Sequence, residues 1–215
     1  IGNLEDITLR ALRVLKEVDV IFCEDTRVTG KLLAKYEIDT KMQSLNARTE
    51  EQKLSLAIEL LSEGKDVAYV SDAGTPCVSD PGSRLVAATR DAGAEVITVP
   101  GPSALTAALS ISGVPTNKFT FFGFLPQKKG RQTALKEVVA LEHTAVLYES
   151  THRILKLLKE LDGYMSANGH ITLARELTKI HEEVLQGTAV ELLQILENNP
   201  QKQKGEFVVI LSLAR

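Results

Sequence analysis

Two loops rich in glycine, proline and acidic residues contain the side chains best suited to chemistry. The first, Ser71–Gly82, reads SDAGTPCVSDPG, and its Asp72 and Asp80 carboxylates can accept hydrogen bonds from hydroxyl or ammonium groups. The second, Val99–Ala104, reads VPGPSA. Glycine allows the backbone of such loops to approach a ligand closely. Because neither loop carries a GxGxxG or Walker pattern, neither specifies a phosphate, and a solvated loop with two Asx turns is the alternative.

A third segment that could carry chemistry, Glu24-Asp25-Thr26-Arg27, directly follows an apolar run. At the carboxyl end of a parallel strand, two acids and a base are well placed for catalysis. Alternatively, Asp25 or Thr26 caps the next helix while Arg27 pairs with an acid. The sequence favours neither interpretation over the other.

A similar segment, Tyr148–Arg153, reads YESTHR between an apolar run and a helical one. Ser150 or Thr151 could cap that helix, which is the purely structural interpretation. However, His152 and Arg153 would then lie in its first turn, where positive charge opposes the helix dipole. This placement favours an anion in front of them.

Two further segments are strongly charged. Arg175–Lys179 reads RELTK, and a solvated turn explains its alternating charge as well as a site does. Lys128, Lys129 and Arg131 form the one local basic cluster of an acidic chain, so they are the best candidates to contact phosphates. The four histidines share no metal-ligand spacing, so we expect no metal site.

The composition describes an ordinary globular protein: 215 residues, 44% hydrophobic and 25% charged, with a formal net charge of -3. A protein that coats free nucleic acid is usually basic, so an RNA partner would have to be met by a local patch. Cys23 and Cys77 stand alone, which predicts a reducing cytoplasm and no disulfide. No apolar run approaches the length of a membrane span.

In the first half of the chain, apolar strands alternate with helices, which is typical of a mostly parallel sheet covered on both faces. The pattern predicts strands at Val18–Cys23, Lys41–Leu45, Asp66–Ser71 and Glu95–Val99, and helices at Leu9–Glu17, Lys31–Tyr36, Arg48–Glu63, Arg84–Ala92 and Ser103–Ser112. Ile1–Leu4 reads like the end of a turn, so we infer that an earlier strand is missing from this numbering. Processing of a mature protein is the alternative.

The second half has a different pattern, and we place a domain boundary at Gly113–Asn117, between residues 1–114 and 115–215. Glu182–Gly187 follows His170–Ala174 too closely for a crossover helix, so that pair should be antiparallel and the sheet mixed. Further strands are predicted at Lys118–Phe124, Thr144–Tyr148 and Glu206–Leu213, and helices at Arg131–Leu141, Ile154–Leu161 and Ala189–Glu197.

Taken in order, these segments resemble the tetrapyrrole methylase superfamily of S-adenosylmethionine-dependent enzymes. Within it the chain is most similar to the branch that methylates the ribose 2′-hydroxyl of a cytidine in 16S ribosomal RNA. The matching stretches are Ile1–Thr8, Cys23–Arg27, Ser71–Gly82, Val99–Ala104, Tyr148–Arg153, Ala174–Glu182 and Gly205–Leu211, which together span nearly the whole chain.

The resemblance implies two small α/β domains with a cofactor cleft between them, and a homodimer. Its cofactor, S-adenosyl-L-methionine, would be bound by residues that match the family's loops. Carried over by motif, these are Gly2, Asp72, Ala73, Gly74, Thr75, Pro100, Gly101, Ser103, Ala104, Phe124, Leu125, Leu177 and Thr178. The loop after the first strand is only partly present, as Ile1-Gly2-Asn3.

The implied reaction is in-line displacement at a sulfonium methyl by a ribose oxygen of the small ribosomal subunit. Enzymes assist such a reaction by alignment and by removing the hydroxyl proton. As candidates we take Asp25 or Glu149 for the base, and Lys179 or Arg27 for stabilising the alkoxide or holding a phosphate. Contacts to RNA would come from Lys128, Lys129, Arg131, His152 and Arg153.

Three alternatives remain open at this point. The same architecture could methylate a tetrapyrrole or a protein side chain, although neither substrate calls for a basic loop. A second possibility is a non-methylating α/β enzyme that binds a phosphorylated metabolite through its glycine and serine loops. A third is an inactive ribosome-assembly factor that uses the same cleft for binding.

Overall fold

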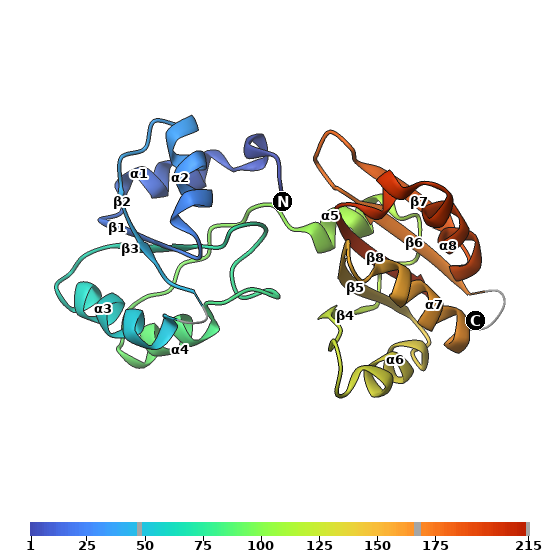
Figure 1. The fold of residues 1–215 in the computed structure, drawn as a ribbon. Coiled ribbons are helices and arrows are strands. Elements are labelled where there is room, and N and C mark those ends of the chain that lie inside the picture. The colour runs from blue at the N-terminus through green and yellow to red at the C-terminus, as the bar shows by residue number, and fades with distance from the viewer. Residues whose placement is uncertain (47–48, 166–168, 214–215) are drawn as a thin grey trace. The chain divides into compact units, whose positions relative to one another are not determined.

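The computed structural model describes residues 1–46, 49–165 and 169–213 and divides the chain into two compact units. Ile1 and residues 3–103 form the first unit, and Gly2 with the chain from Ala104 onward forms the second (Figure 1). The division thus follows Ser103 and precedes the turn at residues 113–117 where the sequence suggested a boundary. The helix between these two points belongs with the second unit.

The first unit contains a parallel three-stranded sheet in the order β2-β1-β3. Its strands are β1 (Val20–Cys23), β2 (Lys41–Ser44) and β3 (Val67–Val70). Its helices are η1 (Leu4–Asp6), α1 (Leu9–Glu17), α2 (Thr26–Lys35), α3 (Glu50–Ser62) and α4 (Ser83–Asp91). The predicted parallel sheet is confirmed for these three strands.

Local capping sets where these helices begin. Thr8 caps α1 as predicted, its hydroxyl accepting a hydrogen bond from Ala11 N at 3.1 Å. Asp25 caps α2, so this helix begins at Thr26 and not at Lys31 as the sequence suggested. The predicted start of α3 at Arg48 lies outside the described residues.

The central strand β1 is buried on both faces, as expected for a parallel sheet covered by helices. Phe22 packs in one cluster with residues of α3 and α4, whereas Ile21 packs in another with residues of α1 and α2. Figure 1 shows these two helix pairs on opposite sides of the sheet. Two thin cores therefore hold the carboxyl end of β1 in place.

The predicted strand at residues 95–99 is wrong, because the structure forms no strand there. Val96 and Ile97 are 37% and 72% exposed. The segment is attached through its carbonyls: Arg10 Nη2 donates to Thr98 O, and Thr8 Oγ1 to Pro100 O, each at 3.4 Å. Among the described residues β3 pairs only with β1, so no adjacent strand is available to pair with this apolar run.

The second unit is built on a mixed five-stranded sheet in the order β4-β5-β8-β6-β7. Its strands are β4 (Phe119–Phe124), β5 (Thr144–Ser150), β6 (His170–Arg175), β7 (Glu183–Gly187) and β8 (Glu206–Ser212). Its helices are α5 (Ala104–Ile111), α6 (Arg131–Val139), α7 (Ile154–Tyr164), α8 (Ala189–Asn198) and η2 (Pro200–Gln203). The predicted antiparallel pairing of β6 with β7 is confirmed.

The second unit has the larger core, formed mainly by leucines of α6, α7 and α8 against one face of β5, β6 and β8. Polar contacts fix α5 to this unit: Tyr148 Oη accepts a hydrogen bond from Leu105 N at 3.1 Å, and Gln186 Nε2 donates to Ser112 O at 2.7 Å. These bonds explain why the division falls before α5.

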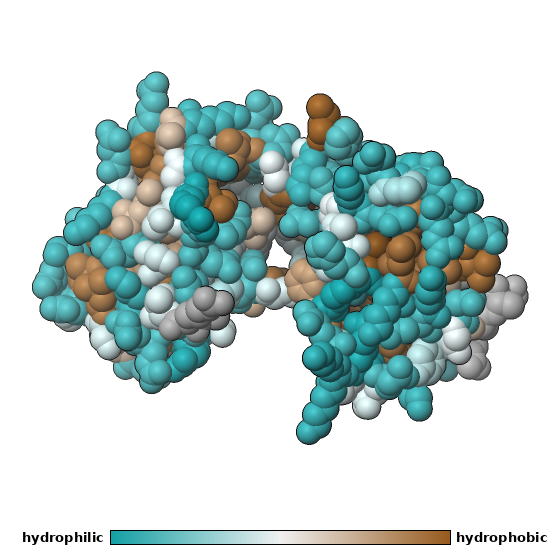
Figure 2. Space-filling model, viewed as in Figure 1, coloured by the Kyte–Doolittle hydropathy of each residue, from teal (hydrophilic) through white to brown (hydrophobic). Residues whose placement is uncertain are grey.

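The surface is mixed in polarity. On the face drawn in Figure 2, hydrophilic side chains cover most of both units and apolar residues form separate patches. Among the helices of the described residues, none combines the length and apolar character needed to cross a bilayer.

Candidate functional site

The loops that follow β1 and β3 lie side by side. The strands are parallel, and Cys23 is paired with Val70, so both loops leave the same edge of the sheet. A hydrogen bond of 3.0 Å from Asp25 N to Asp72 Oδ1 joins the two loops. This is the edge at which parallel α/β sheets bind ligands.

Asp25 is fully engaged by its own neighbours. Arg27 donates to its carboxylate through Nε at 3.0 Å and Nη2 at 2.5 Å, and Arg27 N donates at 2.8 Å. These hydrogen bonds, first from the guanidinium and then from the amide, lower the pKa of Asp25 to about 2. A carboxylate stabilised in this way is a weak proton acceptor, so the structure favours the helix-capping interpretation of this segment.

The loop of residues 71–82 has an irregular backbone. Cys77 and Ser79 have φ angles of 71° and 64°, a left-handed conformation that non-glycine residues rarely adopt. Gly82 has a φ of 121°, and a Cβ there would lie 2.5 Å from Tyr69 Cε1. The loop is therefore held against the ring of Tyr69, and only glycine fits at that position.

A small group of carboxylates lines this loop. Asp80 is half-buried, and the pKa of its carboxyl is raised to about 6, first by burial and then by the negative charges of Glu24 and Asp72. The sequence indicated Asp80 as a hydrogen-bond acceptor without a role in the site. Its environment depends on Glu24, which is distant in sequence, so no local pattern could have shown it.

The second glycine and proline loop meets the first. Thr75 Oγ1 donates to Pro102 O at 3.3 Å, which links the loop of residues 71–82 to that of residues 99–104. A Cβ at Gly101 would meet no atom within 4 Å, and one at Gly74 would meet only Ile1 Cγ2 at 3.9 Å. The backbone at these two glycines is thus accessible to a ligand.

In the second unit, Glu149 is buried between two arginines. Its Oε1 lies 2.9 Å from Arg153 Nε, and its Oε2 lies 3.9 Å from Arg131 Nη2. Arg131 also pairs with Glu160, at 2.6 Å. The anion that we expected in front of Arg153 is therefore this glutamate. With its side chain 1% exposed, Glu149 cannot reach a substrate proton without rearrangement.

The same two arginines bind the backbone after β4. Arg153 Nη2 donates to Leu125 O at 2.7 Å, and Arg131 Nη1 donates to Pro126 O at 3.2 Å. Phe124, directly before them, is 52% exposed and rests edge-on against Tyr148. The buried ion-pair network therefore determines the path of a loop that sequence analysis assigned to the cofactor.

The predicted RNA contacts differ in exposure. Lys128, Lys129 and His152 are exposed, whereas Arg131 is buried and Arg153 is occupied by Glu149. This placement suits Arg131 and Arg153 to holding the loop, and leaves the two lysines and His152 free to meet a partner.

The capping interpretation of Ser150 or Thr151 is wrong. Helix α7 begins at Ile154 with Arg153 as its N-cap. Thr151 Oγ1 instead bonds the backbone of Gly205, donating to its carbonyl and accepting from its amide at 2.8 Å each. The hydroxyl thus ties the start of β8 to the end of β5.

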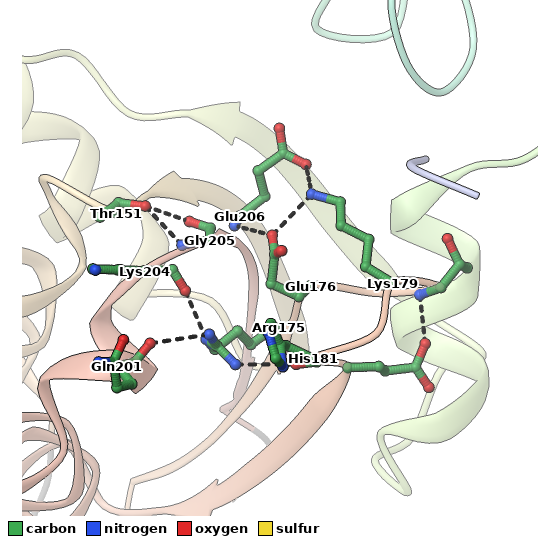
Figure 3. A network of polar contacts seen from close by, with 11 residues as sticks. Thr151, Arg175, Glu176, Lys179, His181, Gln201, Lys204, Gly205 and Glu206 are labelled. Atoms are coloured by element: carbon green, nitrogen blue, oxygen red, sulfur yellow. Dashed lines mark hydrogen bonds and ion pairs between the residues drawn. The ribbon is translucent and has the colours of Figure 1, made fainter. Parts of the chain in front are cut away.

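The turn between β6 and β7 forms a second polar network, drawn in Figure 3. Lys179 Nζ lies 2.8 Å from Glu176 Oε1 and 3.0 Å from Glu206 Oε2. Arg175 donates to the carbonyls of Lys204, His181 and Gln201 at 2.7–3.1 Å. Lys179 is therefore paired with two acids, and the turn is held by the side chain of Arg175.

In this turn the backbone is strained, and one predicted cofactor residue has a buried side-chain hydroxyl without a hydrogen-bond partner. Glu176 and Thr178 have φ angles of 50° and 65°. Leu177 is 7% exposed, and Thr178 Oγ1 is buried without a hydrogen-bond partner. Gly2, with a φ of 137°, also needs the conformational freedom of glycine.

The predicted site residues are thus distributed over both units. Asp25, Arg27 and the loops of residues 71–82 and 99–103 lie in the first unit, whereas Glu149, Lys179 and the turn after β6 lie in the second. Within the described residues, no group of three or more histidine, cysteine or acidic side chains could hold a metal ion.

Comparison with known proteins identifies the family. Residues 1–193 match the model of the tetrapyrrole (corrin/porphyrin) methylases. Two relatives called ribosomal RNA small subunit methyltransferase I are similar to the chain: that of Escherichia coli O157:H7 is 45% identical over 98% of this chain and 74% of its own length, and that of Borrelia garinii subsp. bavariensis is 47% identical over 99% and 95%.

A solved structure shows the same fold. The X-ray structure of the cobalamin biosynthetic enzyme cobalt precorrin-4 methyltransferase matches with a TM-score of 0.71, covering 99% of this chain and 91% of its own, at 19% identity. The sequence matches and this fold agree, and the chain belongs to the tetrapyrrole methylase family, in the group of the ribosomal RNA small subunit methyltransferase I proteins.

Proposed function

We propose that this protein transfers a methyl group from S-adenosylmethionine to the ribose 2′-hydroxyl of a cytidine in the 16S RNA of the small ribosomal subunit. The main support is the set of relatives named ribosomal RNA small subunit methyltransferase I, which are 42–47% identical over 98–99% of the chain. These names specify neither the ribose oxygen nor the cytidine. Both details of the proposal rest on the resemblance of the loops to the family.

The residues present fit the proposed cofactor. Gly74 and Gly101 leave open space beside their backbone, so a bound small molecule can approach the backbone closely there. The buried, unpartnered hydroxyl of Thr178 offers a hydrogen bond that the protein itself does not satisfy. We infer that Asp72–Thr75, the loop of residues 100–104, Phe124–Leu125 and Leu177–Thr178 hold it. When bound, S-adenosylmethionine supplies a methyl group on a sulfonium leaving group.

The protein's own task is to hold the ribose oxygen in line with the reacting methyl and to keep water away. The ion pairs of Glu149 with Arg153 and of Glu176 with Lys179 support this task by fixing the loops after β4 and β6. Arg27 and Lys179 are our candidates for stabilising a developing alkoxide. In this structure Arg27 is paired with Asp25 and Lys179 with Glu176, so each would have to exchange its acid for the substrate.

For binding to RNA we propose Lys128, Lys129 and His152, which are exposed. A chain with a net charge of -3 binds naked RNA weakly, so the substrate is the folded subunit, recognised by shape over a limited basic surface. We further propose that the enzyme works in the cytoplasm, which its two isolated cysteines support, and as a homodimer, which the family resemblance supports.

The first test is to incubate full-length protein with tritiated S-adenosylmethionine and small subunits that lack the methylation. Naked 16S RNA and a protein-only sample serve as substrate controls. We expect label in the RNA of the subunits and much less in naked RNA. Cofactor binding without labelled RNA would contradict the RNA substrate.

A charge variant tests the RNA surface in the same assay. The salt dependence of subunit binding is the slope of the logarithm of the binding constant against the logarithm of the salt concentration. Replacing Lys128 and Lys129 by alanine should reduce the magnitude of this slope by about 1–2, since each phosphate contact contributes about one. The matched control replaces two exposed lysines elsewhere, Lys16 and Lys136, and should leave that slope unchanged. Equal effects of both variants would overturn the assignment.

A further inference from the structure

Phe124, the last residue of β4, presents an aromatic ring to solvent. It is 52% exposed, whereas the next residue, Leu125, is 3% exposed and packs in the core of the second unit. Neighbouring residues of an extended chain point to opposite sides, so the core packing of Leu125 accounts for the outward ring. The cofactor contact proposed for these two residues needs only their backbone, so the ring is left for a second ligand.

The exposed ring is held on a rigid support. It rests edge-on against Tyr148, with the ring centroids 5.6 Å apart, and Tyr148 Oη accepts a hydrogen bond from Leu105 N at 3.1 Å. The backbone directly after the ring is fixed as well, because Arg153 Nη2 donates to Leu125 O at 2.7 Å. A ring that is already fixed loses little conformational entropy when a ligand packs on it.

Basic side chains lie at the same edge of the sheet as this ring. β4 and β5 are parallel, and Phe124 is paired with Tyr148, so the segments that follow the two strands leave this edge together. Lys128 and Lys129 are exposed in the first segment, and His152 is exposed in the second. The aromatic ring thus shares one edge of the second unit with two cations and a histidine.

This combination fits a nucleotide within an RNA chain. Proteins recognise RNA mainly at unstacked bases, which stack on aromatic side chains, while basic residues follow the phosphates. The adenine of S-adenosylmethionine is the other nucleobase of the proposed reaction. However, this cofactor carries no phosphate that Lys128 and Lys129 could neutralise. The two lysines therefore favour RNA as the source of the base.

We propose that the ring of Phe124 stacks on an unpaired nucleobase of the substrate RNA, while Lys128 and Lys129 contact its phosphates. The assignment rests on the proposed function and adds a base-binding contact to it. Stacking neutralises no phosphate and releases no counterion, so the ring raises the affinity for RNA without changing its salt dependence. In this respect the ring differs from the lysines.

The test compares Phe124→Leu with Phe119→Leu, in full-length protein, for binding to unmethylated small subunits over a range of salt concentrations. Phe119 is the matched control, because it is 39% exposed at the other end of β4, and its variant should bind normally. Phe124→Leu should bind about 5–100-fold more weakly at every salt concentration, with an unchanged slope. Phe124→Tyr keeps a ring and should bind within about threefold of normal.

Two further measurements identify the source of the base. The affinity of Phe124→Leu for S-adenosylmethionine, measured by calorimetry, should change by less than about threefold. A loss as large as that for subunits would assign the ring to the cofactor and overturn the inference. Because stacking tolerates any base, naked 16S RNA at low salt should show the same loss as subunits. A loss confined to subunits would indicate a ribosomal protein and would also overturn it.

A loss below about threefold for Phe124→Leu, or an equal loss for Phe119→Leu, would contradict base stacking at Phe124. If Phe124→Leu does not fold, Phe124→Met is judged by the same criteria. Methyl transfer is scored separately from binding. Subunit binding that depends on Phe124 without labelled RNA would support the base contact and refute the proposed reaction. Labelled RNA with normal binding by Phe124→Leu would refute the base contact alone.

Discussion

Glu149 and Asp80 are both acids near the carboxyl end of a strand, but their neighbours are opposite in charge. Glu149 is buried between Arg153 and Arg131, and these arginines also bind the backbone after β4. Asp80 is half-buried, and burial followed by the negative charges of Glu24 and Asp72 raises the pKa of its carboxyl. The comparison shows that residue type and place on a strand do not determine the environment of an acid: Glu149 is held by arginines that fix a loop, whereas burial and neighbouring negative charges raise the pKa of the Asp80 carboxyl.

The largest effect on stability should come from removing Glu149 from its ion pairs with Arg153 and Arg131. Glu149→Ala leaves Arg153 without its carboxylate partner and leaves Arg131 with Glu160 alone, so we expect the free energy of unfolding of the second unit to fall by roughly 3–5 kcal/mol. Urea denaturation measures this change. Glu142→Ala, at an exposed position, is the control and should have little effect. A loss below about 1 kcal/mol for Glu149→Ala would show that the network does not stabilise the unit.

The next effect concerns the backbone that holds Asp80. Gly82→Ala would place a Cβ 2.5 Å from the ring of Tyr69, at a φ of 121°. Gly93→Ala also falls at a positive φ, of 77°, but this value is nearer the left-handed region and its Cβ meets no atom within 4 Å. The clash should therefore make Gly82→Ala less stable than Gly93→Ala by roughly 1–3 kcal/mol. Thermal unfolding compares the two, and equal losses would contradict the close packing of this loop.

A smaller effect should appear in the pH dependence of stability at Asp80. The folded pKa of about 6 exceeds the ordinary value of 3.8, so the folded protein binds more protons between these values. Stability should therefore fall as the pH rises from about 4 to 6, and Asp80→Asn should remove this loss. We expect the variant to gain more in melting temperature near pH 7.5 than near pH 4. An equal shift at both pH values would contradict the raised pKa.

The smallest effect is the pH dependence of stability at Asp25, which should have the opposite sign to that at Asp80. Its folded pKa of about 2 lies below the ordinary 3.8, so its stabilising contribution is present above about pH 4 and is lost as the pH falls towards 2. Because the partner guanidinium of Arg27 is exposed and Asp25 itself is only partly buried, Asp25→Asn should lower the melting temperature only slightly near neutral pH, and less near pH 2.5. A stabilised variant near neutral pH would argue against the pairing with Arg27.

Local features of the fold could be predicted from the sequence. The Thr8 cap of α1 and the antiparallel pairing of β6 with β7 depend on neighbouring residues and on a short connection. The strand predicted at residues 95–99 failed because an apolar run becomes a strand only when another strand pairs with it. Such a partner is a property of the whole sheet and not of the run itself.

The site was harder to predict for the same reason. Arg131 belongs to a basic sequence cluster, but its partner Glu160 lies on the next helix, α7, so its burial has no local signal. Glu149 and Asp80 are distinguished only by residues that folding brings beside them. Sequence motifs thus identified the loops and the family, whereas the surroundings of each acid required the structure.

The most direct test of the proposed function is to locate the methyl group on the RNA. After transfer from labelled S-adenosylmethionine to small subunits, the RNA is digested to nucleosides and separated with chromatography standards. We predict that the label elutes as 2′-O-methylcytidine. Label on a base, or on a nucleoside other than cytidine, would contradict the proposed reaction at the ribose oxygen of a cytidine.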